Sequence, residues 1–376
     1  MPFSVIRDGI ATRVNKQGLI EVVGQDKLRI DYTDSSKGVA LLEPARTNVI
    51  ENSEITSTWT YTEFGSGSAG TITTGKVDMF GGTNAVQVDF PSNAENASLT
   101  FGQTSSSISS GSASISVYIK LISSGSKELQ FRCSTGIKSN VLVDTTDFVR
   151  YEVTGTKGSN ESFSLKVRPS EGTSSGGFSI IVCHPQEEAG SYATSYIPTS
   201  GATSQRQADV ANGAGNSEVF NDSEGVLYAN ISALANDGTF RYIGIFDEQT
   251  SNVDRLQIYY RPDDNKISFL IEENNVNRFV QTLDVKTIQY NKCALQYGNT
   301  SSVYINGFKL AEESGITIPN NLQRLSFNEQ DGSNNFYGKT KEIGVYDAVL
   351  TDAELEALTS YTSFTNMANE LNLTIK

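Results

Sequence analysis

The sequence has few of the residues that build metal sites and disulfides. Its 376 residues include three cysteines and one histidine. Cys133, Cys183 and Cys293 are an odd number of thiols without the Cys-x-x-Cys spacing of zinc sites. His184 has no second imidazole to share a metal ion with. We therefore expect no disulfide framework, no zinc and no resident cofactor.

Long apolar runs and an excess of positive charge are also absent. No stretch of about 18 apolar residues occurs, so we expect no membrane insertion. The first 14 residues contain Arg7, Asp8 and Arg13 and lack the apolar core of a signal peptide. A formal net charge of −14 argues against a nucleic-acid partner. The length fits two or three domains at roughly 150 residues each.

Alternation of apolar and polar residues is abundant instead. It occurs over short segments, among them 86–90, 115–121, 129–133, 163–168, 256–260 and 267–271. Side chains change face at each strand residue, so each set marks one buried face. Clusters of Gly, Ser, Asn and Asp separate the segments. This pattern predicts an all-β fold with two antiparallel β-sandwich (jelly-roll) domains in series.

Two local motifs predict a turn and a helix. Asn306-Gly307 lies between short apolar segments and accepts the positive φ angles of a type I′ hairpin turn. Thr351, three residues before Glu354, forms a capping box and predicts one short helix near the C-terminus.

The polar stretch 200–217 lacks alternation and marks a domain boundary. The apolar positions of the C-terminal tail (Phe364, Met367, Leu371, Leu373 and Ile375) predict docking. We expect an extended N-terminal segment over 1–49, a jelly roll over 50–205, a linker over 206–216, a second sandwich over 217–360 and the tail over 361–376.

Catalytic motifs are weak. The Gly-rich segment 65–70 precedes a strand-like segment rather than the helix of a dinucleotide site. Glu329 and Asp331 could share one strand face, as in a glycosidase, but the carboxyl group that would act as the acid is missing. His184 has no nucleophile elbow in the sequence. We therefore predict that the chain is not an enzyme.

Acidic residues cluster in the second half. They are Asp247, Glu248, Asp254, Asp263 and Asp264. Their oxygens suit Ca²⁺, but the spacing matches no defined calcium loop. A charged, soluble surface is the favoured interpretation, and a bound Ca²⁺ is the less favoured alternative.

Three segments resemble a module of tailed-bacteriophage virion proteins. They are 11–21 with 29–32, 41–48 with 52–54 and Trp59, and 186–199. The resemblance covers about residues 8–210, and between the second and third segments it resembles a carbohydrate-binding-type jelly roll. The second half resembles a laminin-G or concanavalin A-like sandwich, on 303–307, 338–347 and 350–355.

The resemblance implies a virion appendage protein, such as a head or tail fibre or adhesin, made and folded in the host cytoplasm. Its partners would be host surface glycans, other virion proteins and copies of itself, most simply as a homotrimer. A separate virion anchor would be missing or built into 1–49. Two alternatives stay open: a non-enzymatic structural virion protein (adaptor, decoration protein or fibre base) that uses its sandwiches for protein contacts, and a glycan depolymerase.

Sugar recognition needs aromatic rings beside amide or carboxylate groups. Two places in the second half offer both, and the alternative interpretation for each is a turn or a packed aromatic residue. The candidate ligand-binding residues are Asn334, Asn335, Phe336 and Tyr337 in one loop, and Asp247, Arg255 and Tyr259 near a second.

Overall fold

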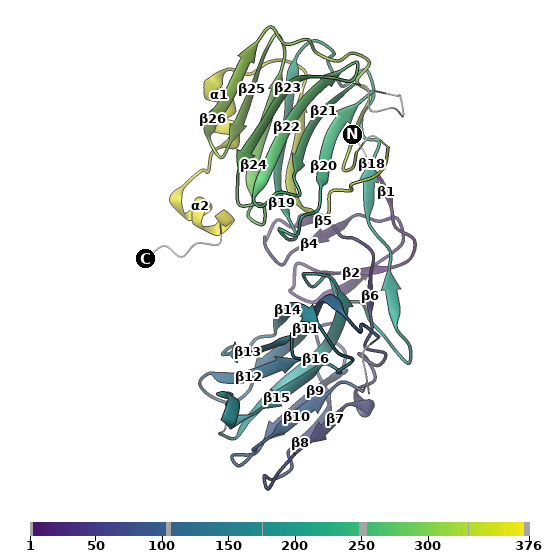
Figure 1. Cartoon of the computed structure of the whole chain (residues 1–376), viewed down its shortest axis with the longest axis vertical. Coiled ribbons are helices and arrows are strands. Elements are labelled where there is room, and N and C mark those ends of the chain that lie inside the picture. Colours follow the sequence, from purple (N-terminus) through teal and green to yellow (C-terminus); the bar gives the residue numbers. More distant parts are fainter. Residues whose placement is uncertain (1–2, 103–106, 175, 248–253, 330, 372–376) are drawn as a thin grey trace. The chain divides into compact units, whose positions relative to one another are not determined.

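The computed structural model of the chain describes residues 3–102, 107–174, 176–247, 254–329 and 331–371. Its regular structure is almost entirely antiparallel strand, with two short helices (Figure 1). The all-β prediction is therefore confirmed. The chain divides into two compact units: unit 1 is Met1–Asp8, Gln25–Pro44 and Ala208–Lys376, and unit 2 is Gly9–Gly24 and Ala45–Gln207.

Unit 2 is a sandwich of two five-stranded sheets, ordered β13-β12-β15-β10-β7 and β14-β11-β16-β9-β8. Their strands are β7 (Thr60–Thr62), β8 (Thr71–Lys76), β9 (Ala85–Phe90), β10 (Ala97–Thr100), β11 (Gly111–Leu121), β12 (Lys127–Arg132), β13 (Lys138–Val143), β14 (Val149–Lys157), β15 (Ser164–Val167) and β16 (Phe178–Ala189). The alternating residues Ile115, Val117 and Ile119 lie in the core between the sheets. Smaller pairs are β2 (Ala11–Val14) with β3 (Ile20–Val23), and β6 (Arg46–Asn48) with β17 (Ser204–Arg206). Two 3₁₀ turns are η1 (Thr56–Thr58) and η2 (Pro169–Glu171).

Unit 1 is a sandwich of a seven-stranded sheet, β26-β25-β24-β19-β28-β5-β4, and a five-stranded sheet, β23-β22-β21-β20-β27. The strands are β4 (Arg29–Asp31), β5 (Val39–Leu42), β19 (Gly225–Ala233), β20 (Arg241–Phe246), β21 (Arg255–Tyr260), β22 (Lys266–Glu273), β23 (Val276–Asp284), β24 (Asn291–Tyr297), β25 (Thr300–Ile305), β26 (Phe308–Ser314), β27 (Arg324–Ser326) and β28 (Gly338–Tyr346). A short pair joins β1 (Ser4–Ile6) to β18 (Val210–Asn212). Leu256, Ile258 and Tyr260 point into the core.

The turn and the capped helix are both confirmed. Asn306 and Gly307 have φ angles of 52° and 90° and join β25 to β26. Helix α1 (Asp352–Thr359) begins with a capping box between Thr351 and Glu354. Its Leu355 packs on the outer side of the seven-stranded sheet.

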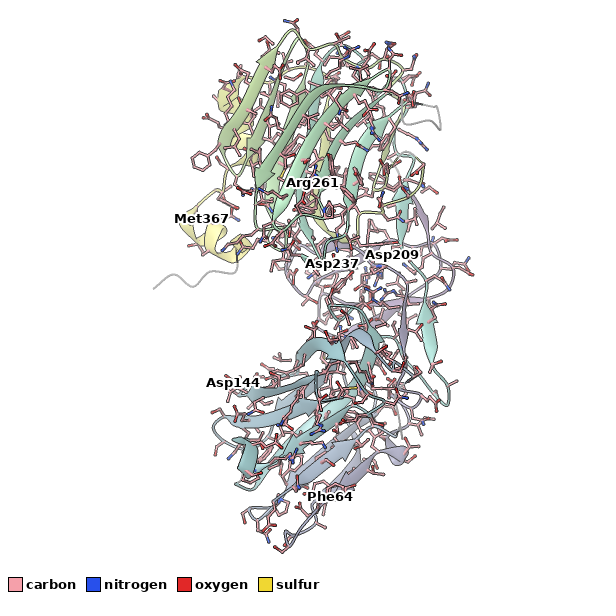
Figure 2. All side chains as sticks on the ribbon, viewed as in Figure 1. Phe64, Asp144, Asp209, Asp237, Arg261 and Met367 are labelled. Carbon is pink, nitrogen blue, oxygen red and sulfur yellow. The ribbon has the colours of Figure 1, made fainter. Side chains whose placement is uncertain are left out.

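A second helix, α2 (Phe364–Leu371), occupies the predicted tail. Met367, labelled in Figure 2, is half-buried, and the neighbouring Ala368 is 4 % exposed. Leu373 and Ile375 lie outside the described residues. No helix in the described part of the chain is long and apolar enough to cross a membrane.

The N-terminal 49 residues do not form the separate segment that we expected. They contribute strands to both units, and β4 and β5 complete the seven-stranded sheet, where Leu42 pairs with Gly338 of β28. The partner strand is far away in the sequence and the early strands are short, so local alternation could not reveal this pairing.

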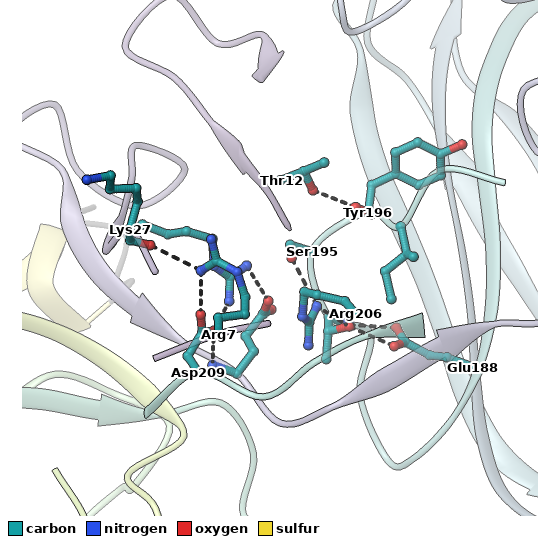
Figure 3. Close-up of polar contacts among 12 residues, drawn as sticks. Arg7, Thr12, Lys27, Glu188, Ser195, Tyr196, Arg206 and Asp209 are labelled. Atoms are coloured by element: carbon teal, nitrogen blue, oxygen red, sulfur yellow. Dashed lines mark hydrogen bonds and ion pairs between the residues drawn. The ribbon is translucent and has the colours of Figure 1, made fainter. Parts of the chain in front are cut away.

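A buried ionic cluster ties the early residues to unit 1 (Figure 3). We define it by Arg7, Arg29, Glu43 and Asp209, and each of these residues is at most 3 % exposed. Asp209 accepts from the Arg7 guanidinium at 2.7 Å and from that of Arg29. Arg29 also binds Glu43 at 2.6 Å. Two cations and two carboxylates leave the cluster neutral, which burial requires.

In unit 2, residues of the segments 45–48 and 186–199 form a buried polar network. Glu188 accepts from the backbone N–H and the hydroxyl of Thr194, at 2.6 and 2.7 Å, and Thr194 accepts from Arg206 at 3.1 Å (Figure 3). The side chain of Asn48 donates to the carbonyl of Ile197 at 2.9 Å and accepts from the N–H of Glu187 at 3.2 Å. These motif residues therefore fix the course of irregular backbone, and buried carbonyls and N–H groups need such partners.

Candidate ligand-binding face

The outer side of the five-stranded sheet of unit 1 holds a group of aromatic residues. Strand alternation turns Ile243 and Ile258 into the core and places Tyr242 and Tyr259 on the opposite, outer side. We call this side the aromatic face and define it by Phe240, Tyr242, Tyr259 and Leu270, which pack together.

The three rings form a stack. Tyr242 and Tyr259 are directly opposite in the β20–β21 register, with centroids 4.5 Å apart and an interplanar angle of 20°. Phe240 stacks on Tyr242 at 5.6 Å and 25°. Both tyrosines are 8 % exposed, whereas Phe240 is half-buried. Burial and the nearby carboxylate of Glu329 raise the pKa of Tyr242 well above its ordinary value, so its hydroxyl stays protonated.

An ion triad lies on the same side of the sheet. Arg255 is opposite Glu272 in the β21–β22 register and binds it at 2.9 Å. Its other terminal nitrogen binds Glu329 at 3.1 Å. One guanidinium therefore engages both carboxylates, which hold it in one position.

The loop that follows β27 joins the triad to the rings. The Asn334 side chain donates to Glu329 at 2.8 Å. The backbone carbonyl of Asn334 accepts from the N–H of Tyr242 at 3.3 Å. Asn335 forms an isolated parallel bridge with Tyr242. The two places predicted from the sequence, the 334–337 loop and the Arg255–Tyr259 strand, are therefore brought together beside Tyr242.

Phe336 and Asp247 are corrections to the candidate set. Phe336 is fully buried and packs 6.1 Å from Tyr260 and 5.8 Å from Phe327. Its N–H donates to the carbonyl of Phe327 at 2.8 Å, and this bond turns the ring into the core. Asp247, at the end of β20, is 3 % exposed. Neither side chain is available to a ligand on the aromatic face.

Asn334, Asn335 and Tyr337 have different surroundings. Asn334 is exposed and has a positive φ of 48°, which asparagine tolerates. Asn335 is half-buried, and its Nδ2 donates to the Tyr337 hydroxyl at 3.3 Å. The backbone carbonyl of Tyr337 accepts from Arg241 Nε at 2.8 Å.

Gln257 is the polar residue at the middle of the outer side, between the tyrosines and the triad. It is fully buried, and neither its Oε1 nor its Nε2 has a hydrogen-bond partner among the residues that the structure describes. Gly244 makes room for it, because a Cβ there would lie 2.9 Å from Gln257 Cγ. A buried amide without hydrogen-bond partners lowers the free energy of unfolding, because its desolvation is not compensated.

Sequence reasoning missed Tyr242, Gln257 and Glu272, and it considered Glu329 only as half of a weak catalytic motif. The alternation in 241–246 and 255–260 could have placed Tyr242 and Gln257 on one face. The cross-strand register that brings Glu272 to Arg255 has no local sequence pattern.

The acidic loop residues do not gather into a metal site in the described part of the chain. No group of three or more His, Cys, Asp or Glu side chains there could hold a metal ion. Asp263 accepts from Arg261, which is labelled in Figure 2, at 2.7 Å, and Asp264 accepts from Asn236. Glu248 lies outside the described residues.

No protein-family model and no curated protein sequence matches the chain. Solved structures similar to it include the CBM40 domain of the Ruminococcus gnavus IT-sialidase, 16 % identical, which covers 40 % of this chain and 94 % of that one with a TM-score of 0.33. A SAP-like pentraxin from Limulus polyphemus is 10 % identical, over 41 % of this chain and 76 % of that one, with a TM-score of 0.33. The receptor-binding domain of botulinum neurotoxin C/D mosaic serotype is 13 % identical, over 40 % of each chain, with a TM-score of 0.31. Similarities this weak carry no argument about the ligand of this chain.

Proposed function

We propose that the chain is a non-catalytic glycan-binding protein of a bacteriophage virion appendage, a head or tail fibre or adhesin, and that the aromatic face binds host surface glycan. The observation that supports glycan binding is the position of Tyr242, which stacks on Phe240 and whose N–H donates to Asn334, the residue that also binds Glu329. A ring, a carboxylate and an amide side by side match the apolar faces and hydroxyl groups of a sugar. The virion role is supported by the resemblance of residues 8–210.

The ion triad favours binding over hydrolysis. Glycoside hydrolysis needs one carboxyl group that holds a proton and one that does not. Glu272 and Glu329 both bind the same guanidinium, at 2.9 and 3.1 Å. The two carboxylates therefore share one environment, whereas an acid and a base in one site need different environments.

A glycan array with the full chain tests the proposal, followed by titration of the glycan that binds. Phe240→Ala removes a half-buried ring from the aromatic face, and Phe308→Ala removes a ring that is 69 % exposed on β26 of the same unit. We expect Phe240→Ala to weaken binding about tenfold, which is about 1.4 kcal/mol, and Phe308→Ala to leave it unchanged. Asn334→Ala, on an exposed residue, should weaken binding without changing the melting temperature.

Three results would contradict the proposal. Equal effects of Phe240→Ala and Phe308→Ala would move the site away from the aromatic face. Failure to bind any glycan, with the protein present in purified virions by immunogold labelling, would favour the structural virion protein. Release of reducing ends from host polysaccharide would favour a depolymerase.

A further inference from the structure

Unit 2 contains the sheet β13-β12-β15-β10-β7, whose strands are labelled in Figure 1. Polar side chains lie on its outer side. Phe131 and Leu165 point into the core, so their neighbours Gln130 and Lys166 point outward. Gln130 and Lys166 are directly opposite in the β12–β15 register. Asn140 is opposite Gln130 on the other neighbouring strand.

Positive charge is concentrated around this pair on a chain whose net charge is −14. We call the group the cationic face and define it by Arg132, Lys138, Lys166 and Arg168. Glu161 binds Arg132 at 2.9 and 3.3 Å, and Glu171 binds both Lys138 and Arg168. A third carboxylate, Glu128, lies two residues before Gln130 on β12 and therefore on the same side of the sheet, so four cations stand against three carboxylates.

Lys166 is the cation of this face for which the described residues provide no direct ion pair. It is half-buried, and no hydrogen bond or ion pair of its ammonium group occurs within the described part of the chain. Burial lowers the pKa of Lys166, and the charges of Arg132 and Arg168 lower it further, while the carboxylates of Glu161 and Glu171 act in the opposite direction. The Nε of Arg168 is buried and also has no acceptor among the described residues. Both groups would gain from an anion.

Gln130 supplies an unused acceptor at the same place. It is 1 % exposed, and its Nε2 donates to Glu171 at 2.9 Å. Its Oε1 is buried and accepts no hydrogen bond from the described residues. A ligand that brings both a hydrogen-bond donor and a negative charge would satisfy this oxygen and the Lys166 ammonium group together.

We propose that the cationic face binds the anionic group of an acidic glycan, a uronate carboxylate or a sulfate ester. Lys166 and Arg168 bind the charged group, and the Lys166 side chain, directly opposite Gln130, turns towards the ligand and uncovers Gln130 Oε1 for a sugar hydroxyl. This site is additional to the aromatic face, because it lies on a different sheet of a different unit.

Calorimetric titration of the full chain tests this site with three probes of similar length: a galacturonate trimer, a sulfated heparin-derived tetrasaccharide and a neutral galactose oligomer. We expect at least one charged probe to bind, the neutral one not to bind at the cationic face, and affinity to fall between about 50 and about 500 mM NaCl. Binding of the uronate alone identifies a carboxylate site, and binding of the sulfated probe alone identifies a sulfate site.

Lys166→Gln should weaken that binding about tenfold or more, because hydrogen bonds to charged groups are among the stronger ones. Lys166→Arg should restore it. Lys76→Gln removes the same charge from β8, on the other sheet of unit 2, and should have no effect. Gln130→Met removes only the acceptor and should weaken sugar binding more than binding of inorganic sulfate. Melting curves of each variant show whether it is folded.

The proposal is overturned if neither charged probe binds more tightly than inorganic sulfate, or if Lys166→Gln and Lys76→Gln have equal effects. Affinity of the wild type for inorganic sulfate alone would mean an unspecific anion contact. Phe240→Ala should leave acidic-glycan binding intact, and Lys166→Gln should leave binding at the aromatic face intact, so failure of one site is distinguishable from failure of the other.

Discussion

Replacing Asp209 by Asn tests whether the buried ionic cluster holds the early residues in unit 1. Asn keeps the shape of the side chain and removes its charge. In the wild type, the Asp209 carboxylate accepts from Arg7 at 2.7 Å, from Arg29, and from the N–H of Glu43 at 2.9 Å. After the change, two buried guanidinium groups share the single carboxylate of Glu43.

The magnitude follows from the burial. The side chains of Arg7 and Arg29 are fully buried, so water cannot replace the lost charge. Breaking a buried pair while its partner stays buried costs about 3–5 kcal/mol. For a domain of roughly 150–250 residues, 1 kcal/mol shifts the melting temperature by about 2–4 °C. We therefore expect the melting temperature of unit 1 to fall by about 6–20 °C.

Calorimetry of the full chain, with circular dichroism as a second probe, measures the shift. Asp8→Asn makes the same chemical change at an exposed residue next to Arg7 and should stay within about 0.5 kcal/mol of the wild type. The double variant Arg7→Met with Asp209→Asn leaves one cation and one carboxylate, so it should recover about half of the loss. If Asp209→Asn changes stability no more than Asp8→Asn does, the cluster does not hold the fold together and the reasoning is wrong.

The remaining predictions concern the helix cap, pH, assembly and metal ions. Thr351→Ala removes the acceptor that caps α1 and should cost about 1 kcal/mol, read as a shift of about 2–4 °C in melting temperature. Hydrogen bonds from Lys138 and Gln130 lower the pKa of Glu171 to about 2 from its ordinary value of 4.5. Because the pKa of Glu171 is lower in the folded state, its contribution to stability is complete above about pH 4.5 and is lost as the pH falls towards 2. The urea midpoint of Glu171→Gln should therefore change less with pH in that window than the midpoint of the wild type. Light scattering should give three times the chain mass of 40.7 kDa for the proposed homotrimer, and a mass of one chain at micromolar concentration would contradict it. EDTA and reducing agents should leave the protein folded, whereas a fall of more than about 5 °C with EDTA would show a bound cation in the acidic loops of unit 1.

Features that depend on neighbouring residues were predictable from the sequence. The alternation in 256–260 and 267–271 gave both the strands and their buried faces, because each side chain's face depends on its position along one strand. The Asn306-Gly307 turn and the Thr351 cap were predictable for the same reason, since each is completed within a few residues.

Features that depend on distant residues were not predictable. Glu43 and Asp209 are polar and lie in segments without alternation, so nothing local indicates that they are buried together. Strands β4 and β5 have three and four residues, too few to show a period. The 1–49 segment was therefore predicted as separate, although it completes a sheet.

The candidate site was predictable in part for a related reason. Arg255 and Tyr259 lie on one strand, two alternations apart, and could be placed on one face. The loop 331–335 has no alternating pattern, so the sequence does not show that the Phe336 side chain points into the core. In the structure, the N–H of Phe336 donates to the distant carbonyl of Phe327. Tyr242 lies beside Tyr259 because of the β20–β21 register, and the pattern of one strand does not determine its register with the next.

The order of the strands along the chain also determines when the seven-stranded sheet of unit 1 can be completed during synthesis. Asp34, between β4 and β5, binds Lys339 of β28 across 305 residues. At about 5–20 residues per second, a ribosome needs about 15–60 s to make the intervening chain. Throughout that interval, β4 and β5 have only each other to pair with, and the edge of β5 that later meets β28 is open to pairing with another chain. Yield of the folded protein should therefore rise when the growing chains are kept apart, by slower initiation or by chaperones that cover the early strands until β28 emerges.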